Sequence, residues 1–255
     1  LIRVDKPRWL AFSSDLATIY QQSGNHLAAL KLYHEILSVY EAGHSLSGDN
    51  SESIWTKRGF AKVVPGESVT QQYNIAEVLR GIGSSYFEIG NYEKAAEYFL
   101  QSYNKFKTLN STLSQNVFFV LIPLSTCYSE IHRVEASIKY AREAYEMADR
   151  YDMGEDEEML ALTNYANILL SYGKEKETLD VLNSALRKTT DNQIKAGIYN
   201  SLSYIYAEHG SSDKAIEFSQ LAASLSDDPV YFHNLAVHYS NAKDFTKNTR
   251  KQRSY

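Results

Sequence analysis

The residues Gly81, Ile82 and Gly83 place two glycines at the spacing that opens a phosphate-binding loop. A dinucleotide-binding loop needs a third glycine three residues after the second, and Tyr86 occupies that position. Such a loop also follows a strand, whereas the preceding stretch QQYNIAEVLR has the apolar spacing of a helix. The pattern therefore predicts two glycines with a structural role and no nucleotide site.

Metal binding and catalysis require clusters of side chains that the sequence does not offer. His233 and His238 are five residues apart in a helical stretch, whereas two ligands on one helix face are three or four apart. Cys127 is the single cysteine, so no intramolecular disulfide or thiolate cluster can form. No HExxH, CxxC, GxSxG or Walker motif occurs. We therefore predict no catalytic residue, no metal site, no cofactor and no enzymatic activity.

Charge and hydropathy exclude two further classes of partner. The formal charge of −5 gives no overall positive field for direct nucleic-acid binding. No apolar run approaches the roughly 20 residues of a membrane helix, so we expect no membrane span. One unpaired cysteine suits a reducing compartment, and we expect a cytoplasmic location. The last thirteen residues carry five basic side chains against Asp244, and we expect this basic tail to be solvated and frayed.

One order of residue types recurs in six stretches that begin near residues 10, 76, 118, 159, 196 and 229. In the second stretch, Gly83, Tyr86, Gly90, Ala95 and Phe99 follow one another at fixed spacing. The other stretches repeat this order with Ala17, Tyr20, Gly24, Ala29 and Tyr33; Tyr128, His132, Ser137, Ala141 and Ala144; Ala166, Leu169, Gly173, Leu182 and Ala185; Ser203, Tyr206, Gly210, Ala215 and Ala222; and, as half a copy, Leu235, Ala236, Tyr239 and Phe245.

Within each copy, apolar residues fall at helical spacing on both sides of a turn that contains glycine. Small residues such as Gly83 and Ala17 allow two antiparallel helices to approach closely. The turn residues Gly24, Gly90 and Gly173 stand where a helix ends in a left-handed conformation. A single hairpin cannot bury its apolar face, so neighbouring hairpins must stack. The sequence therefore predicts an all-α array of helical hairpins.

This pattern resembles the tetratricopeptide repeat over about 200 of the 255 residues. The resemblance implies an all-α, right-handed superhelical solenoid of about five to six antiparallel helix pairs. We expect one continuous domain with a lead at 1–9, a first repeat at 10–41, an inserted loop at 42–68, repeats two to six at 69–241 with the last one incomplete, and the basic tail at 242–255.

Three local features modify this scheme. Pro123 lies within the first helix of the third copy and should kink or delay it. The run GEDEE, residues 154–158, should place carboxylates at the start of the next helix, where they favour its dipole. The inserted loop holds apolar and basic residues side by side, and these could contact a ligand: Trp55, Lys57, Arg58 and Phe60.

The first helices of stacked hairpins line a concave face, which predicts the position of a binding groove. Their second, fifth, ninth and twelfth positions point inward. Asn167 and Asn200 are the most informative of these residues, because an amide can pair with peptide main chain as donor and acceptor. The candidate groove residues are Arg80, Ser84, Thr163, Asn167, Asn200, Tyr204 and His233.

The chaperone-binding members of the family hold a ligand carboxylate with Lys and Arg at the second and sixth positions of a later repeat. Here those positions hold Phe119 and Pro123, or Leu160 and Asn164, so this clamp is absent. Our interpretation is a non-enzymatic scaffold that binds a protein or peptide segment, of undetermined oligomeric state. Two alternatives stay open. One is a peptide-sensing regulatory domain, similar to the peptide-pheromone receptors of Gram-positive bacteria. The other is an architectural subunit whose last half-repeat exposes an apolar patch.

Overall fold

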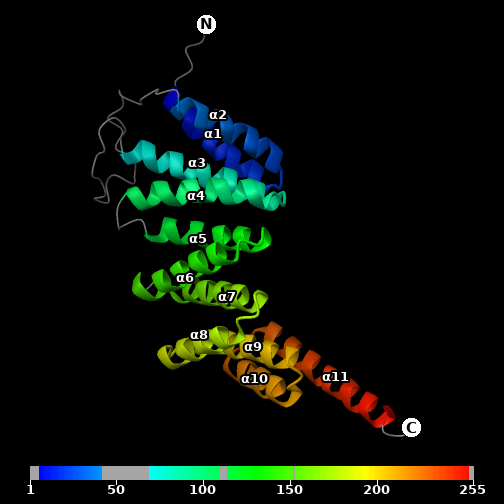
Figure 1. Ribbon diagram of the computed structural model, residues 1–255. Coiled ribbons are helices and arrows are strands. Elements are labelled where there is room, and N and C mark those ends of the chain that lie inside the picture. Colours follow the sequence, from blue (N-terminus) through cyan, green and yellow to red (C-terminus); the bar gives the residue numbers. More distant parts are fainter. Residues whose placement is uncertain (1–5, 42–68, 110–113, 152, 253–255) are drawn as a thin grey trace. The chain divides into compact units, whose positions relative to one another are not determined.

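The computed structural model describes residues 6–41, 69–109, 114–151 and 153–252, and these form helices without strands (Figure 1). The all-α prediction is therefore confirmed for this part of the chain. Contacts divide the chain into two compact units, Leu1–Asp152 and Met153–Tyr255, which are described separately below. Both the single continuous domain and the handedness of the array stay predictions.

The described residues of the first unit form three antiparallel hairpins. Each hairpin packs on the next through α2 against α3 and α4 against α5, as the order of the ribbons in Figure 1 shows. Phe99, Phe106, Phe118 and Leu121 are fully buried in this stack. The helices are α1 (Lys6–Gln22), α2 (His26–Glu41), α3 (Val69–Glu88), α4 (Tyr92–Thr108), α5 (Ser114–Glu130) and α6 (Val134–Tyr151).

The second unit contains two hairpins and a long final helix. Helix α11 packs on α10 and α9, and α8 packs on α9. Leu169, Leu182, Ile198 and Leu202 are fully buried here. The helices are α7 (Glu155–Ser171), α8 (Glu175–Lys188), α9 (Asn192–Glu208), α10 (Ser212–Leu225) and α11 (Pro229–Gln252). No helix in the described ranges has the length and apolar content needed to cross a membrane.

The turns within the hairpins have the predicted left-handed geometry. Gly24, Gly90, Gly173 and Gly210 have φ between 67° and 81°, and His132 takes the same place in the third hairpin with φ 56°. At the end of α3, the Gly90 amide donates to the Phe87 carbonyl and the Asn91 amide to that of Tyr86, both at 2.9 Å. These bonds satisfy carbonyls that the end of a helix leaves without partners.

The two glycines of the Gly-Ile-Gly stretch make room for aromatic rings. A Cβ atom on Gly83 would lie 2.8 Å from Cδ1 of Phe99, and one on Gly81 would lie 2.5 Å from Cζ of Tyr33. Both distances are shorter than side-chain packing allows, so α3 approaches α4 and α2 this closely because these positions lack side chains. The prediction of a structural role for both glycines is confirmed.

Of the local expectations, one is wrong in part, one is wrong and one is confirmed. Helix α5 begins at Ser114 and continues through Pro123, so the proline does not delay it, and the kink stays a prediction. The carbonyl of Ile122 accepts hydrogen bonds from the Ser125 and Thr126 hydroxyls at 2.7 and 3.1 Å. Helix α11 reaches Gln252, so most of the expected frayed tail is helical. Glu155, Asp156, Glu157 and Glu158 occupy the first turn of α7, as predicted.

Candidate functional site: a polar groove in the first unit

A groove of about 690 Å³ lies in the first unit, between the first helices of its first two hairpins. Helices α1 and α3 form its walls, and Tyr33 and Tyr40 of α2 complete it. Amide, hydroxyl and charged groups alternate with a few apolar side chains along it. Its lining residues include Leu10, Ser14, Asp15, Thr18, Gln21, Gln22, Asn74, Glu77, Val78, Arg80 and Ser84.

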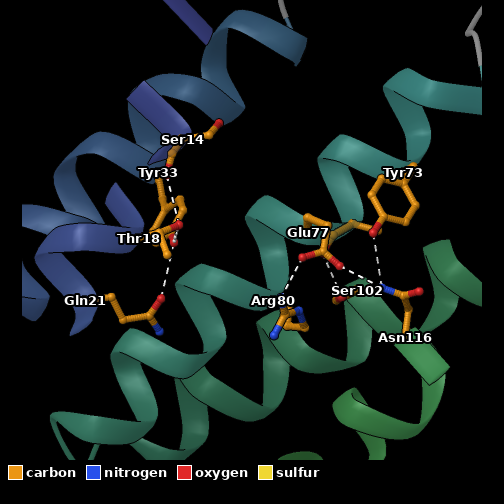
Figure 2. Close-up of polar contacts among 10 residues, drawn as sticks. Ser14, Thr18, Gln21, Tyr33, Tyr73, Glu77, Arg80, Ser102 and Asn116 are labelled. Carbon is orange, nitrogen blue, oxygen red and sulfur yellow. Dashed lines mark hydrogen bonds and ion pairs between the residues drawn. The ribbon is translucent and has the colours of Figure 1, made fainter. Parts of the chain in front are cut away.

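A chain of hydrogen bonds orders the α1 wall (Figure 2). The Tyr33 hydroxyl donates to Oε1 of Gln21 at 3.2 Å, and it lies 3.4 Å from the Thr18 hydroxyl. Thr18 itself donates to the main-chain carbonyl of Ser14 at 3.0 Å. Burial raises the pKa of Tyr33, so its hydroxyl stays protonated and keeps this donor role at neutral pH. The Gln21 amide nitrogen retains its two donors for a ligand.

The α3 wall carries an ion pair that is fixed from a third helix (Figure 2). Nη2 of Arg80 donates to Oε2 of Glu77 at 2.6 Å, and Nδ2 of Asn116 donates to Oε1 of Glu77 at 3.0 Å. Asn116, from α5, also donates to the Tyr73 hydroxyl at 3.3 Å. Both oxygens of Glu77 are thus engaged, which fixes the carboxylate that orients Arg80.

Arg80 is permanently charged and has N–H donors that its bond to Glu77 does not use. Desolvation lowers the pKa of its guanidinium, but the charge of Glu77 and its hydrogen bond outweigh this effect, so the pKa is raised overall. Its Nε is buried without a hydrogen-bond partner in the part of the chain that the structure describes. A guanidinium carries five N–H donors, so one bond to Glu77 leaves capacity for a carbonyl or carboxylate of a ligand.

Two of the seven candidate residues, Arg80 and Ser84, lie in this groove. Sequence reasoning missed its α1 wall, although the signal was available. The second, fifth, ninth and twelfth positions of the first copy are Ala11, Ser14, Thr18 and Gln21, and all four line the groove. The prediction from the sequence covers these positions in later copies only.

The other five candidates lie in the second unit. Asn167, Tyr204 and His233 are exposed, whereas Thr163 and Asn200 are half-buried. The Thr163 hydroxyl donates a hydrogen bond to Sδ of Met159 at 3.4 Å. Oδ1 of Asn200 accepts from Nδ2 of the buried Asn234 at 2.9 Å, so the amide oxygen is engaged and the amide nitrogen stays a donor. The Tyr204 ring contacts His238 edge-on, with ring centroids 5.6 Å apart.

The four loop candidates, Trp55, Lys57, Arg58 and Phe60, lie outside the described residues. Within the described ranges, no group of three His, Cys, Asp or Glu side chains could hold a metal ion.

The tetratricopeptide repeat model matches residues 76–104 and 196–229, which correspond to α3–α4 and to α9–α10 with the first residue of α11. Many solved structures share the fold, among them proteins described as having tetratricopeptide repeats. These two segments therefore match the tetratricopeptide repeat, and the described residues have an all-α helical repeat fold. No significant match was found among curated protein sequences.

Three solved structures illustrate the likeness. YrrB, described as a TPR protein with an unusual peptide-binding site, is 15% identical over 90% of each chain, with a TM-score of 0.53. Aspartyl phosphate phosphatase F from Bacillus subtilis is 15% identical with a TM-score of 0.64, over 91% of this chain and 55% of its own. The Rap conjugation gene regulator of plasmid pLS20, in complex with the Phr* peptide, is 13% identical with a TM-score of 0.53, over 90% and 57%. At such identities the likeness shows the fold alone.

Proposed function

We propose that the protein is a non-enzymatic scaffold that holds an extended segment of a peptide or protein in the groove between α1 and α3. The observation that carries this proposal is the arrangement of amide and hydroxyl groups around one fixed cation, Arg80. The neutral polar groups suit peptide main chain, which offers a donor and an acceptor at each residue.

Each wall would have its own role in recognition. The Gln21 amide nitrogen would donate to a main-chain carbonyl, and the Thr18 hydroxyl oxygen would accept from a main-chain N–H. Asn74 would act as donor and acceptor across the groove. Arg80 would anchor one carbonyl or carboxylate of the ligand through a charge-assisted bond. The rings of Tyr33 and Tyr40 would contact an apolar side chain. Such a site would recognise the main chain of a peptide more than the identity of its side chains.

The second unit offers a further set of polar residues, for which we propose a role in ligand contact. Asn167 and Tyr204 are exposed on the first helices of their hairpins, at the positions that correspond to Thr18 and Ser84 in the first unit. Asn200 keeps its amide nitrogen as a donor. An Asn167→Ala/Tyr204→Ala double variant tests this role, because these exposed residues can be shortened without leaving the buried Asn234 unpaired.

A selection of peptides from a phage-displayed library of random dodecapeptides tests the groove. The affinities of the selected peptides would be measured for the wild type, for Arg80→Met and for Lys31→Met, a control that also loses one positive charge, on the exposed side of α2. Loss of a charge-assisted hydrogen bond costs about 1.5–3 kcal/mol, so Arg80→Met should weaken binding by roughly 10- to 100-fold. Lys31→Met should leave it unchanged. Equal affinities for all three proteins would refute the proposal.

A second candidate is a peptide-sensing regulatory domain. The likeness to a Rap regulator solved with the Phr* peptide favours it, and this chain spans 57% of that protein's length. In such a role, the groove would be the sensor and a further segment would carry the output. The discriminating observation is a peptide that binds the groove and changes the activity of the full-length native protein. Peptide binding without any such change would leave the scaffold function alone.

A further inference from the structure

The final helix exposes an apolar face that the other first helices bury or half-bury. Phe232 of α11 is 49% exposed and Tyr239 is 41% exposed, and Ala236 between them is exposed as well. These three residues are spaced by four and three, so they share one side of the helix. We call Phe232, Ala236 and Tyr239 the open face of α11.

The chain itself shows what covers this face elsewhere. The position of Ala236 corresponds, in the five complete hairpins, to small residues that are all buried: Ala17, Gly83, Ser125, Ala166 and Ser203. Two of them contact the second helix of their own hairpin, since Gly83 makes room for the Phe99 ring and the Ser125 carbonyl accepts from Ser137. Two hydrogen bonds show that the second helix, which covers this face, runs antiparallel to the first: one lies near the turn of a hairpin and the other at its open end. Ser137 donates to the Ser125 carbonyl at 2.9 Å in the third hairpin, and Ser102 donates to that of Ala76 at 2.8 Å in the second.

The tyrosine of the face has a recurrent partner. In three hairpins the residue that corresponds to Tyr239 stacks on an aromatic ring of the second helix. The pairs are Tyr86 on Tyr98, Tyr128 on Tyr140 and Tyr206 on Phe218, with ring centroids 5.7, 5.6 and 5.3 Å apart and planes within 15° of parallel. Tyr239 occupies this place on α11. Its hydroxyl accepts a hydrogen bond from the side-chain amide of Gln220 in α10 at 2.8 Å, and this bond orients the exposed ring.

The covering helices share a pattern that defines the missing occupant. Each of the three carries a small residue at i, the stacking ring at i+3 and a second small residue at i+7. The small residues are buried in all three helices, with 0–1% of each exposed: Ala95 and Ser102, Ser137 and Ala144, Ala215 and Ala222. Small residues at both ends allow the helix axes to approach, and the ring between them stacks on the tyrosine.

We propose that the open face of α11 binds an amphipathic helix of a partner protein, antiparallel to α11, with small residues at i and i+7 and an aromatic residue at i+3. The partner would complete the last hairpin in trans, using the packing that the chain uses three times internally. A second copy of α11 fits less well. Its nearest match to the pattern is Ala242, Phe245 and Thr249, which puts a β-branched threonine where the template buries the smaller Ser102, Ala144 or Ala222.

The test uses a probe taken from the chain, the α6 sequence Val134–Tyr151 with a fluorescent label. An isolated helix of this length is marginal in water, so a lactam between the exposed Glu135 and Lys139 would hold it helical. Fluorescence anisotropy would report its binding to the wild type, to Ala236→Arg and to Ser224→Arg, a matched control at an exposed position of α10. Ala236 is exposed, so the arginine does not disturb the fold of the free protein.

The wild type and Ser224→Arg should bind the probe saturably, and Ala236→Arg should weaken it by more than about tenfold, because a buried unpaired charge is costly. A Tyr140→Ala probe should bind about three- to tenfold more weakly through the lost stacking. Equal binding by Ala236→Arg, or no binding of a probe that circular dichroism shows to be helical, would overturn the proposal. So would a dimer that sedimentation detects and Ala236→Arg dissolves, since a second copy would then cover the face. The Arg80→Met variant should bind the probe normally, which separates this surface from the groove.

Discussion

At the scale of single residues, Cys127 provides a direct check of the first unit's core. Its side chain is fully buried, and desolvation raises the pKa of its thiol to about 12. The reactive species is the thiolate, so both burial and pKa suppress modification at neutral pH. We predict that a thiol reagent such as an aromatic disulfide modifies no cysteine in the native protein and one per chain in denaturant. Rapid stoichiometric modification of the native protein would contradict the packing of α5.

His238 gives the second unit a dependence on pH. It is buried near the Ser203 hydroxyl, at 3.3 Å, and desolvation lowers its pKa below the ordinary value of 6.5. In the unfolded chain, His238 therefore takes up a proton near pH 6.5, whereas in the folded chain it is protonated only at lower pH. The folded protein consequently loses stability as the pH falls below 6.5.

We predict that the melting temperature falls more between pH 7 and pH 5 in the wild type than in His238→Gln, which cannot take up this proton. The difference between the two proteins isolates His238 from the other titrating groups. An identical pH dependence in both would show that His238 is not held neutral by burial.

The residue scale also shows how far the sequence reaches. The roles of Gly83 and Gly81 could be predicted, because close helix approach requires a residue without a side chain and the repeat places it. The position of Arg80 in a groove followed from the same periodicity. The sequence could not predict that Glu77 and Asn116 hold the Arg80 side chain in place. Glu77 and Asn116 are 39 positions apart and meet only because α5 packs beside α3.

At the scale of elements, the hairpin turns offer a matched pair of substitutions. Gly90 has φ 81° and nothing within 4 Å of a Cβ placed on it, whereas His132 holds the equivalent left-handed place with φ 56°. Gly90→Ala should destabilise the protein by about 1 kcal/mol through backbone strain alone. His132→Gly should relieve the same strain, partly offset by the freedom of glycine in the unfolded chain. Chemical denaturation should therefore give shifts of opposite sign; shifts of the same sign would contradict this origin.

Helix ends and interruptions mark where local reasoning failed. The proline rule predicted a late start of α5, yet the helix packs against α4 and α6 and is already formed nine residues before Pro123, at Ser114. In the same way, composition predicted a frayed basic tail, yet residues to Gln252 continue α11. Predictions of helix ends from residue propensity and composition are weak where a helix can continue from a segment that is already packed.

At the scale of the whole molecule, each of the two compact units has its own buried core. We predict that Phe99→Ala destabilises the first unit by about 3–5 kcal/mol, because it removes a fully buried ring from the contact with Gly83. Modification of Cys127 should then accelerate, since its core opens more often.

The second unit should respond less to this change. Hydrogen exchange of the amides in α9 and α10 should be nearly unaltered in Phe99→Ala, with the wild type as reference. Loss of protection throughout both units to the same extent would show that the chain unfolds as one cooperative body and that the division into units has no energetic meaning.

The central claim is that an extended peptide lies between α1 and α3, and photo-crosslinking tests it most directly. A benzoylphenylalanine would replace Ala11, which is exposed and lines the groove, or Ser38, which is exposed on α2 and does not line it. Peptides selected on the wild type would be irradiated with each protein, and the products would be mapped by mass spectrometry. Crosslinks from position 11 and none from position 38 are the result that the groove predicts. Equal crosslinking from both positions, or from position 38 alone, would place the peptide outside the groove and contradict the proposed function.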